Sequence, residues 1–293
     1  MKVLVTGAGG LVGRAVVAHC AAQGDKVSAH DRASLEITRA PEVHAVFERA
    51  RPDTVINCAA WTDVDGCELD PERALAVNAY AVETLAHACR QAGASFVTIS
   101  TDYVFAGDKD GFYTQRDDPE PQSAYGISKL KGEWLARIAS ARTVVVRTGW
   151  VFGRGGRNFL ATALERARRG EQLRAIGDAY GTPTYAPHLA ARLRELAALD
   201  LPGLYHVTGG GDGTSYAGFA RAAVSLAGAP GATVVEVSMD TLARPAPRPR
   251  NSRLRCLLSA AAGLAPLPDW QTALAEFAAE ELRARAAADE RPD

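Results

Sequence analysis

The stretch that decides the fold is VTGAGGLVG, residues 5–13, which lies between a short apolar run and an alanine- and valine-rich helical pattern. It spaces Gly7, Gly10 and Gly13 as GxxGxxG. A tight strand-to-helix turn needs positive φ, a pyrophosphate needs close approach to bare backbone, and a helix packed on a sheet needs a small residue. The phosphate then lies over the free N–H groups of the helix. The stretch therefore predicts dinucleotide binding at the first turn of a βαβ unit.

On either side of the glycines, strand-length apolar runs alternate with helical patterns through the first half of the chain. We expect strands at residues 2–8, 26–31, 53–60, 94–100 and 143–152, and helices at 11–23, 41–49, 79–91 and from about 123. Short, fully apolar strands separated by helices are typical of a parallel sheet covered on both faces. With right-handed crossovers, the sequence predicts an α/β fold with a doubly wound parallel sheet, the Rossmann arrangement.

The second half, from about residue 153, is interrupted by glycine and proline. We expect helices near residues 158–169, 186–198, 215–227 and 270–287, and strands near 204–207 and 233–237. The segment ARPAPRPRNSRL (243–254) has too many prolines for a helix or a central strand, which indicates an ordered loop lying on the surface or over a cleft. The prediction is a dinucleotide-binding domain over 1–152 and a smaller α/β substrate-binding domain over 153–293, with some segments returning to the first sheet.

Composition excludes several classes of protein. With 293 residues, 47% hydrophobic and 23% charged, the chain is of ordinary globular composition. A net charge of −1 argues against nucleic-acid binding, and no run approaches the ~18 apolar residues of a membrane span. The first strand begins at once, so we expect no secretory signal. Scattered cysteines without a CxxC pair and histidines without metal-ligand spacing favour a cytoplasmic, metal-free protein with reduced thiols.

Two charged residues at the end of the second expected strand bear on the choice of cofactor. Asp31 lies about 18 residues beyond Gly13, where an acid can bind the adenosine ribose 2′-OH of NADH. Arg32 follows at once and could instead bind the 2′-phosphate of NADPH. Asp31 could also simply open a surface loop. The sequence leaves NADPH and NADH both open.

Tyr125 and Lys129 are spaced four residues apart, which places them on one face of a helix. Of the eight tyrosines, only Tyr125 has a lysine at this spacing. A nearby ammonium is expected to lower the pKa of the phenol, and lysine can hold a nicotinamide ribose, which together indicate general acid–base catalysis. A tyrosine packed under a surface lysine is the plainer alternative. Ser100 and Thr101 end a parallel strand, where ligands bind in such sheets, although hydroxyl residues are also common strand ends.

Taken together, these residues resemble the dTDP-4-dehydrorhamnose reductases, a family of the extended short-chain dehydrogenase/reductase superfamily. The resemblance covers nearly the whole chain. It is carried by VTGAGGLVG (5–13), RPDTVINCAAWTDVDGCE (51–68), ISTDYVFAG (99–107), SAYGISKLKGE (123–133), RTGWVFG (147–153), GLYHVTG (203–209) and RPRNSRL (248–254).

The resemblance implies reduction of the C4 keto group of dTDP-4-dehydrorhamnose to dTDP-L-rhamnose with NADPH or NADH, by a monomer or homodimer. It implies a catalytic triad of Thr101, Tyr125 and Lys129. The cofactor-binding residues it implies are Gly7, Gly9, Gly10, Leu11, Val12, Gly13, Asp31, Arg32, Glu36, Ile37, Ala59, Ala60, Thr62, Tyr125 and Lys129. Asp102, Tyr103 and Trp150 would line the sugar pocket, and Asn158, Arg248 and Asn251 would hold the nucleotide diphosphate. Core packing of Trp150 and a merely solvated Arg248 are the alternatives from the residues themselves.

The sequence also departs from the family pattern. Ala179 stands where glutamine is usual, and Glu36 and Arg255 stand where aspartate is usual. These departures leave open a 4-ketoreductase of another dTDP-4-keto-deoxyhexose or pentose-type sugar, in antibiotic or glycoconjugate synthesis. A sugar-nucleotide epimerase or dehydratase uses the same tyrosine–lysine pair and is a second alternative. A non-catalytic regulatory subunit is a third, against which the intact triad argues.

Overall fold

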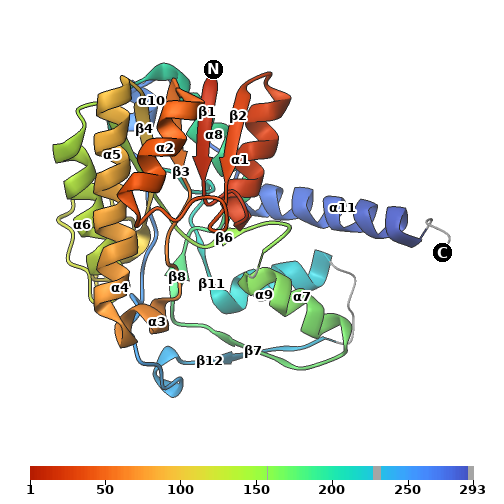
Figure 1. The fold of residues 1–293 in the computed structure, drawn as a ribbon. Helices are drawn as coiled ribbons and strands as arrows, with labels where there is room; N and C mark the ends of the chain where they lie inside the picture. Colours follow the sequence, from red (N-terminus) through yellow and green to blue (C-terminus); the bar gives the residue numbers. More distant parts are fainter. Residues whose placement is uncertain (157, 227–231, 290–293) are drawn as a thin grey trace.

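The central feature of the computed structural model, which describes residues 1–156, 158–226 and 232–289, is a six-stranded parallel sheet (Figure 1). Its strand order is β10-β5-β4-β3-β1-β2, and every neighbouring pair is parallel. The strands are β1 (Lys2–Thr6), β2 (Lys26–His30), β3 (Thr54–Asn57), β4 (Ser95–Thr101), β5 (Thr143–Thr148) and β10 (Gly203–His206). The order reverses at β1, which confirms the predicted doubly wound α/β fold.

Helices cover both faces of this sheet. On one face α1 (Leu11–Ala22) packs against α8 (Ala186–Leu199), and on the other lie α2 (Ala40–Ala50), α5 (Ala81–Ala92) and α6 (Ala124–Ala139). Because successive side chains of a strand point to opposite faces, Leu4 joins the core beneath α2 and α5. Its neighbours Val3 and Val5 join the core beneath α1 and α8. The apolar strands are therefore buried on both sides, as their composition indicates.

A smaller unit lies beyond the carboxyl ends of the sheet strands (Figure 1). In it β7 (Leu173–Ile176) pairs in parallel with β12 (Val234–Val237), and α7 (Phe159–Arg168) packs against α9 (Tyr216–Leu226). Short strand pairs join it to the sheet: β6 (Val151–Phe152) with β9 (Thr184–Tyr185), and β8 (Tyr180–Gly181) with β11 (Thr214–Ser215). The chain closes with α10 (Leu258–Ala261) and α11 (Trp270–Asp289), which extends away from the body (Figure 1).

The expected elements are found with small shifts in their ends, and several short ones were not expected. Within the second half, β10 and α8 return to the main sheet. The helix expected at 215–227 is α9, and residue 227 lies outside the described residues. The sequence did not predict β7, nor α3 (Val64–Leu69) and α4 (Pro71–Leu75). The functional division at residue 152 stays a prediction. Across the described residues, the helices are all too short or too polar to cross a membrane.

Candidate functional site

The glycine loop has the tight geometry that its sequence indicates. Gly7 has φ of 66°, and a Cβ there would lie 2.6 Å from the Ala59 nitrogen. A Cβ on Gly13 would collide with the carbonyl oxygen of Gly7. Gly10 is the N-cap of α1, and no side chain caps the helix there. The first N–H groups of α1 are therefore free for a ligand. The loop is thus a cradle that larger residues would fill, at a helix N-terminus suited to a phosphate.

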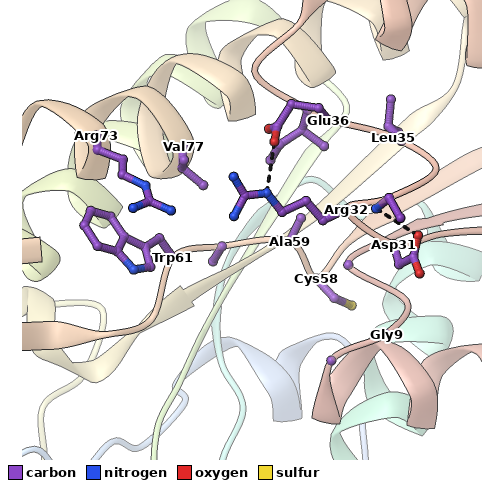
Figure 2. Close-up of a pocket in the computed structure, with 15 residues that line it drawn as sticks. Gly9, Asp31, Arg32, Leu35, Glu36, Cys58, Ala59, Trp61, Arg73 and Val77 are labelled. Atoms are coloured by element: carbon purple, nitrogen blue, oxygen red, sulfur yellow. Dashed lines mark hydrogen bonds and ion pairs between the residues drawn. The ribbon is translucent and has the colours of Figure 1, made fainter. Parts of the chain in front are cut away.

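A cavity of about 440 Å³ opens between this loop and the ends of β2 and β3 (Figure 2). Asp31 and Arg32 both line it. The Asp31 Oδ1 accepts hydrogen bonds from the backbone and hydroxyl of Ser34 at 3.0 and 2.9 Å. The Arg32 Nε donates to Glu36 Oε2 at 3.1 Å, which holds the guanidinium across the cavity (Figure 2). The expected residues Gly7, Gly9, Gly10, Glu36, Ile37, Ala59 and Ala60 line the same cavity.

The far wall of this cavity is built by residues that the sequence analysis missed. The Arg73 guanidinium lies 4.4 Å from the centre of the Trp61 ring, and both line the cavity (Figure 2). Asn78 fixes the Trp61 backbone, because its Oδ1 accepts from the Trp61 N–H at 2.8 Å and its Nδ2 donates to the Trp61 carbonyl at 3.0 Å. Asn78 also donates to Ser128 Oγ on α6 at 3.1 Å. The burial of Asn78, which is 1% exposed, is a property of the fold that the sequence alone does not reveal.

A second cavity of about 440 Å³ continues from the first, because Gly10, Cys58, Ala59 and Ala60 line both. The remaining expected cofactor residues on its wall are Leu11, Val12, Gly13, Thr62, Tyr125 and Lys129. Thr101, Asp102, Tyr103 and Trp150 line it as well, together with the unexpected Tyr216. The structure therefore brings the glycine loop, the tyrosine–lysine pair and the end of β4 to two adjoining cavities.

Tyr125 and Lys129 lie on the buried face of α6, which begins at the N-cap Ser123. Lys129 Nζ donates to the Ile99 carbonyl at 2.7 Å, so its ammonium is anchored to β4. Burial raises the pKa of Tyr125, an effect that hydrogen bonding with Thr101 only partly offsets. Burial also lowers the pKa of Lys129 to about 8. The expectation that Lys129 lowers the pKa of the phenol is therefore wrong for this structure, because burial of the phenol outweighs it.

Thr101 and Asp102 form a hydrogen-bonded pair at the end of β4. The Thr101 hydroxyl donates to Asp102 Oδ1 at 3.0 Å and accepts the Tyr103 N–H at 3.1 Å. Asp102 is 3% exposed, and burial raises the pKa of its carboxyl to about 6. Its Oδ2 has no hydrogen-bond partner among the described residues. A buried carboxyl with a free oxygen facing a cavity is poised to change charge near neutral pH.

Trp150 sits at the edge of the second cavity in a strained backbone conformation, with φ of 50°. Its indole stacks on Tyr216 with ring centres 3.7 Å apart. Gly181 packs so closely against the indole that a Cβ there would collide with it. Packing, the plainer alternative from the sequence, thus accounts for much of its surroundings. A positive φ at a non-glycine residue costs conformational free energy, so the surrounding contacts must hold Trp150 in place.

The three residues expected to hold a diphosphate lie outside the two cavities and bind parts of the chain. Asn158 is the N-cap of α7, where its Oδ1 accepts from Ala161 N at 2.9 Å. Arg248 makes a two-pronged ion pair with Asp65, at 2.6 and 2.9 Å. The Asn251 amide donates to the Lys109 and Gly111 carbonyls. Their role toward a diphosphate stays a prediction. The described residues contain no group of three or more acids, histidines or cysteines able to hold a metal.

Comparisons with known proteins agree with this architecture. The family model described as the RmlD substrate binding domain matches residues 1–283. A dTDP-4-dehydrorhamnose reductase of Streptomyces griseus is 39% identical over 279 residues, covering 93% of this chain and 91% of that protein. A probable dTDP-4,6-dihydroxy-2-methyloxan-3-one 4-ketoreductase of Streptomyces antibioticus is 38% identical over 280 residues, covering 94% of each. The crystal structure of a Bacillus anthracis dTDP-4-dehydrorhamnose reductase in complex with NADP superimposes with a TM-score of 0.92 at 32% identity, over 95% of this chain and 98% of that one.

Proposed function

Because the chain belongs to the dTDP-4-dehydrorhamnose reductase family, we propose that it reduces the C4 keto group of a dTDP-linked 4-keto-6-deoxy sugar. The substrate that we propose is dTDP-4-dehydro-6-deoxy-L-mannose, and the product is dTDP-L-rhamnose. The chain is an NAD(P)H-dependent oxidoreductase, since its curated relatives are named as reductases and a related reductase is solved in complex with NADP. The observation that carries the proposal is the joining of the glycine-loop cavity to a second cavity that holds Thr101, Tyr125 and Lys129.

The residues present fit a nicotinamide dinucleotide. The bare backbone at Gly7 and Gly13 leaves room at the start of α1 for a pyrophosphate, which its free N–H groups would bind. Asp31 and Arg32 would hold the adenosine ribose, and Ala59, Ala60 and Thr62 would lie along the dinucleotide. Lys129 would hold the nicotinamide ribose, because its ammonium has donors left after binding the Ile99 carbonyl.

The cofactor supplies a hydride to C4 of the sugar when it is bound. Tyr125 then donates its proton to the oxygen that becomes the C4 hydroxyl. Because burial raises the pKa of Tyr125, the phenol holds this proton at neutral pH until the oxygen gains charge. Thr101, at the end of β4, stabilises the same oxygen by hydrogen bonding. Asp102, Tyr103 and Trp150 would line the sugar, and Asn158, Arg248 and Asn251 would support the diphosphate through the loops that they bind.

The first test of this mechanism is the Tyr125→Phe variant. We expect turnover to fall by 10²-fold or more (on the order of the contribution of a general acid), with NADPH affinity nearly unchanged. Fluorescence titration with NADPH measures binding. The loss of NADPH absorbance at about 340 nm measures turnover. Preserved turnover with lost cofactor affinity would reject the proton-donor role.

The second test concerns the sugar, since a relative named as a 4-ketoreductase of a different substrate is about as similar as the rhamnose reductases. We would generate dTDP-4-keto-6-deoxyglucose, add a 3,5-epimerase, and follow NADPH and NADH. Consumption that requires the epimerase, with dTDP-rhamnose as product, supports the proposal. Consumption without the epimerase favours the sibling reductase instead. Cofactor that stays bound and is never consumed would favour an epimerase or dehydratase.

We place the enzyme in the cytoplasm, where its proposed substrate and reduced cofactor are available. We also propose that it acts as a monomer or homodimer, without nucleic-acid or membrane partners. Sedimentation of the purified protein distinguishes a monomer from a homodimer.

A further inference from the structure

We propose that Cys256 is a modification site, at which the thiol forms a reversible mixed disulfide with a small cysteine-type thiol, one that carries an N–H group and a carboxylate. Cys256 lines a third cavity, of about 400 Å³, between the end of β10 and residues 254–267. None of the described residues that line this cavity lines either of the other two. The site is therefore distinct from the one proposed for cofactor and sugar.

The Cys256 sulfur is reachable and is held by a fixed donor. The residue is partly exposed, and Gln115 Nε2 donates a hydrogen bond to Sγ at 3.0 Å. Gln115 is itself fixed, because its Oε1 accepts the Leu257 N–H at 2.9 Å and its Nε2 also donates to the Leu204 carbonyl at 3.2 Å. A donor aimed at sulfur stabilises the thiolate, which is the form that attacks a disulfide.

The pKa values of the five cysteine thiols single out the same residue. Burial would raise the pKa of Cys256, but hydrogen bonds from Ser259, from the His206 backbone and from Gln115 outweigh it, so this pKa is lowered. Burial raises the pKa of the other four thiols, those of Cys20, Cys58, Cys67 and Cys89. At neutral pH the thiolate of Cys256 is therefore the most populated of the five.

The imidazole of His206, in the lining of the same cavity, lacks a hydrogen-bond donor. The side chain is 3% exposed, and Nδ1 lies 3.0 Å from the Arg255 carbonyl, so Nδ1 carries the hydrogen. Burial lowers the pKa of His206 to about 4, so at neutral pH Nε2 keeps its lone pair. Nε2 has no hydrogen-bond partner among the described residues. A buried acceptor without a donor is destabilising, and an N–H group of a molecule in the cavity would supply one.

Arg255 gives the cavity a cation that is available to a ligand. Its guanidinium lies 3.9 Å from the centre of the Phe112 ring and forms no ion pair among the described residues. The other charged side chains of the lining are Arg192, which is paired with Glu195 at 2.8 Å, and Asp212. A carboxylate bound in the cavity would therefore find its partner in Arg255.

A cysteine-type thiol carries sulfur, an N–H group and a carboxylate within a few bonds, which matches the thiolate, the imidazole and the guanidinium of this cavity. The co-reactant is the disulfide of that thiol. The Cys256 thiolate attacks one sulfur of the disulfide, a new S–S bond forms, and the old S–S bond breaks. Its electron pair leaves with the second sulfur, which departs as a thiolate and takes a proton from water. An excess of small thiol reverses the exchange.

The first experiment treats the protein with cystine at neutral pH and follows the adducts by intact mass and peptide mapping. We expect one cysteinyl group, on Cys256, formed on the order of tenfold faster than on any other cysteine and removed by dithiothreitol. Cys256→Ser should take up none at this rate. Modification of Cys58 as fast as that of Cys256 would overturn the proposal. Mapping of the wild type decides this even if the variant fails to fold.

The second experiment tests recognition of the carboxylate by comparing cystine with cystamine, which lacks carboxylates. We expect Arg255→Ala to lower the ratio of the cystine rate to the cystamine rate about fivefold or more. The ratio cancels any change in the reactivity of the thiol itself. Arg116→Ala is the matched control, because it removes an exposed arginine beside Gln115 that is absent from the lining of the cavity. An equal fall of the ratio in both variants would overturn the role of Arg255.

The third experiment tests the N–H group by ¹⁵N NMR of the histidine rings. We expect the Nε2 signal of His206 to move when the cysteinyl adduct forms and to return after dithiothreitol, because Nε2 gains and then loses a donor. Methyl methanethiosulfonate leaves only an S-methyl group on Cys256 and should leave this signal in place. An Nε2 signal that ignores the cysteinyl adduct would overturn the assignment to a cysteine-type thiol. The three experiments measure adducts and not turnover, so a failure of the proposed function leaves their outcome unchanged.

Discussion

At the scale of single residues, burial sets the protonation of Tyr125, the proton donor that we propose. An exposed phenol would exchange its proton with water, whereas the buried Tyr125 keeps it, because the pKa is raised. This suits a donor in the direction of reduction, where the developing alkoxide is a stronger base than phenolate. The same burial acts on Lys129, whose charged form loses hydration that the Ile99 carbonyl and the charge of Glu133 only partly replace. The fold thus keeps a cation at an unfavourable position, on the same face of α6 as the proton donor that we propose.

That cost makes the stability of the protein depend on pH. Because burial lowers the pKa of Lys129 to about 8, the unfolded chain binds more protons than the folded one between about 8 and the ordinary value of 10.5. The lysine's contribution to stability therefore rises with pH through this window. We expect Lys129→Met to be stabilising at pH 7, by roughly 1–3 kcal/mol, and to lose this advantage near pH 10 (about the ordinary pKa of lysine).

Urea unfolding of the two proteins at several pH values measures the difference directly. The free energy of unfolding of Lys129→Met must be compared with that of wild type at each pH. Buried thiols such as Cys58 and Cys89 have raised pKa values, so they change the stability of both proteins with pH in the opposite direction. A difference between Lys129→Met and wild type that does not change with pH would mean that the buried lysine carries no such cost.

Arg32 is the residue that should decide between the two cofactors. Its side chain is 78% exposed, and its only ion-pair partner among the described residues is Glu36. A 2′-phosphate would offer the guanidinium a stronger partner than Glu36 does. We expect Arg32→Ala to raise KM for NADPH about tenfold or more and to change KM for NADH less than about twofold. Initial rates with each cofactor measure the ratio.

The matched control is Arg39→Ala, which removes a similar exposed arginine paired with Glu42 at 2.9 Å. Arg39 is absent from the residues that line the first cavity, so neither KM should change. An equal rise in both KM values for Arg32→Ala would show that the guanidinium holds the adenosine without reading the phosphate.

At the scale of elements, the sequence predicted best what depends on local pattern. The central strands are continuous apolar runs, and α6 begins at Ser123, whose hydroxyl accepts the Gly126 N–H. The β7 strand was missed because LRAI is short and owes its conformation to pairing with Val234–Val237, far along the chain. The same holds for site residues: the glycines are recognisable by spacing, whereas Asn78 and Tyr216 reach the site only through the fold.

The joint between α6 and β5 is a buried ion pair. Arg147 donates from Nε and Nη2 to the two oxygens of Glu133, at 2.9 and 2.7 Å, and both side chains are at most 4% exposed. Because α6 carries Tyr125 and Lys129, this pair helps to set their height above the sheet. It is also the place where removing one charge leaves the other without hydration or a partner.

We expect Glu133→Gln to lower the free energy of unfolding by about 3–5 kcal/mol, since Arg147 would be left buried and unpaired. The double replacement Glu133→Leu with Arg147→Met should recover most of that loss. Chemical denaturation of the three proteins measures both effects. A single variant as stable as wild type would mean that water reaches Arg147, and that the pair does not fix α6.

At the scale of the whole molecule, the site lies where the two halves of the chain meet. The first cavity is lined only by residues from the first 77 positions, with Val77 the last of them. The second adds Trp150 and Val151, from the segment that joins the sheet to the smaller unit, and Tyr216, the first residue of α9 in that unit. Since Gly10, Cys58, Ala59 and Ala60 line both cavities, a ligand bound in one would contact residues that also line the other.

This shared wall predicts that the two ligands bind cooperatively. We expect NADP⁺ to tighten the binding of dTDP-rhamnose about five- to tenfold, which corresponds to a coupling of roughly 1 kcal/mol. Thermodynamic linkage then requires dTDP-rhamnose to tighten NADP⁺ by the same factor, so calorimetric titrations in both orders check each other. Adenosine 2′,5′-bisphosphate corresponds to the adenosine part of NADP⁺ alone, so it should occupy only the first cavity. We expect it to tighten the binding of dTDP-rhamnose less than NADP⁺ does. Equal affinities with and without the second ligand would show that the two cavities act independently, and that the joined space serves only to bring the reacting atoms together.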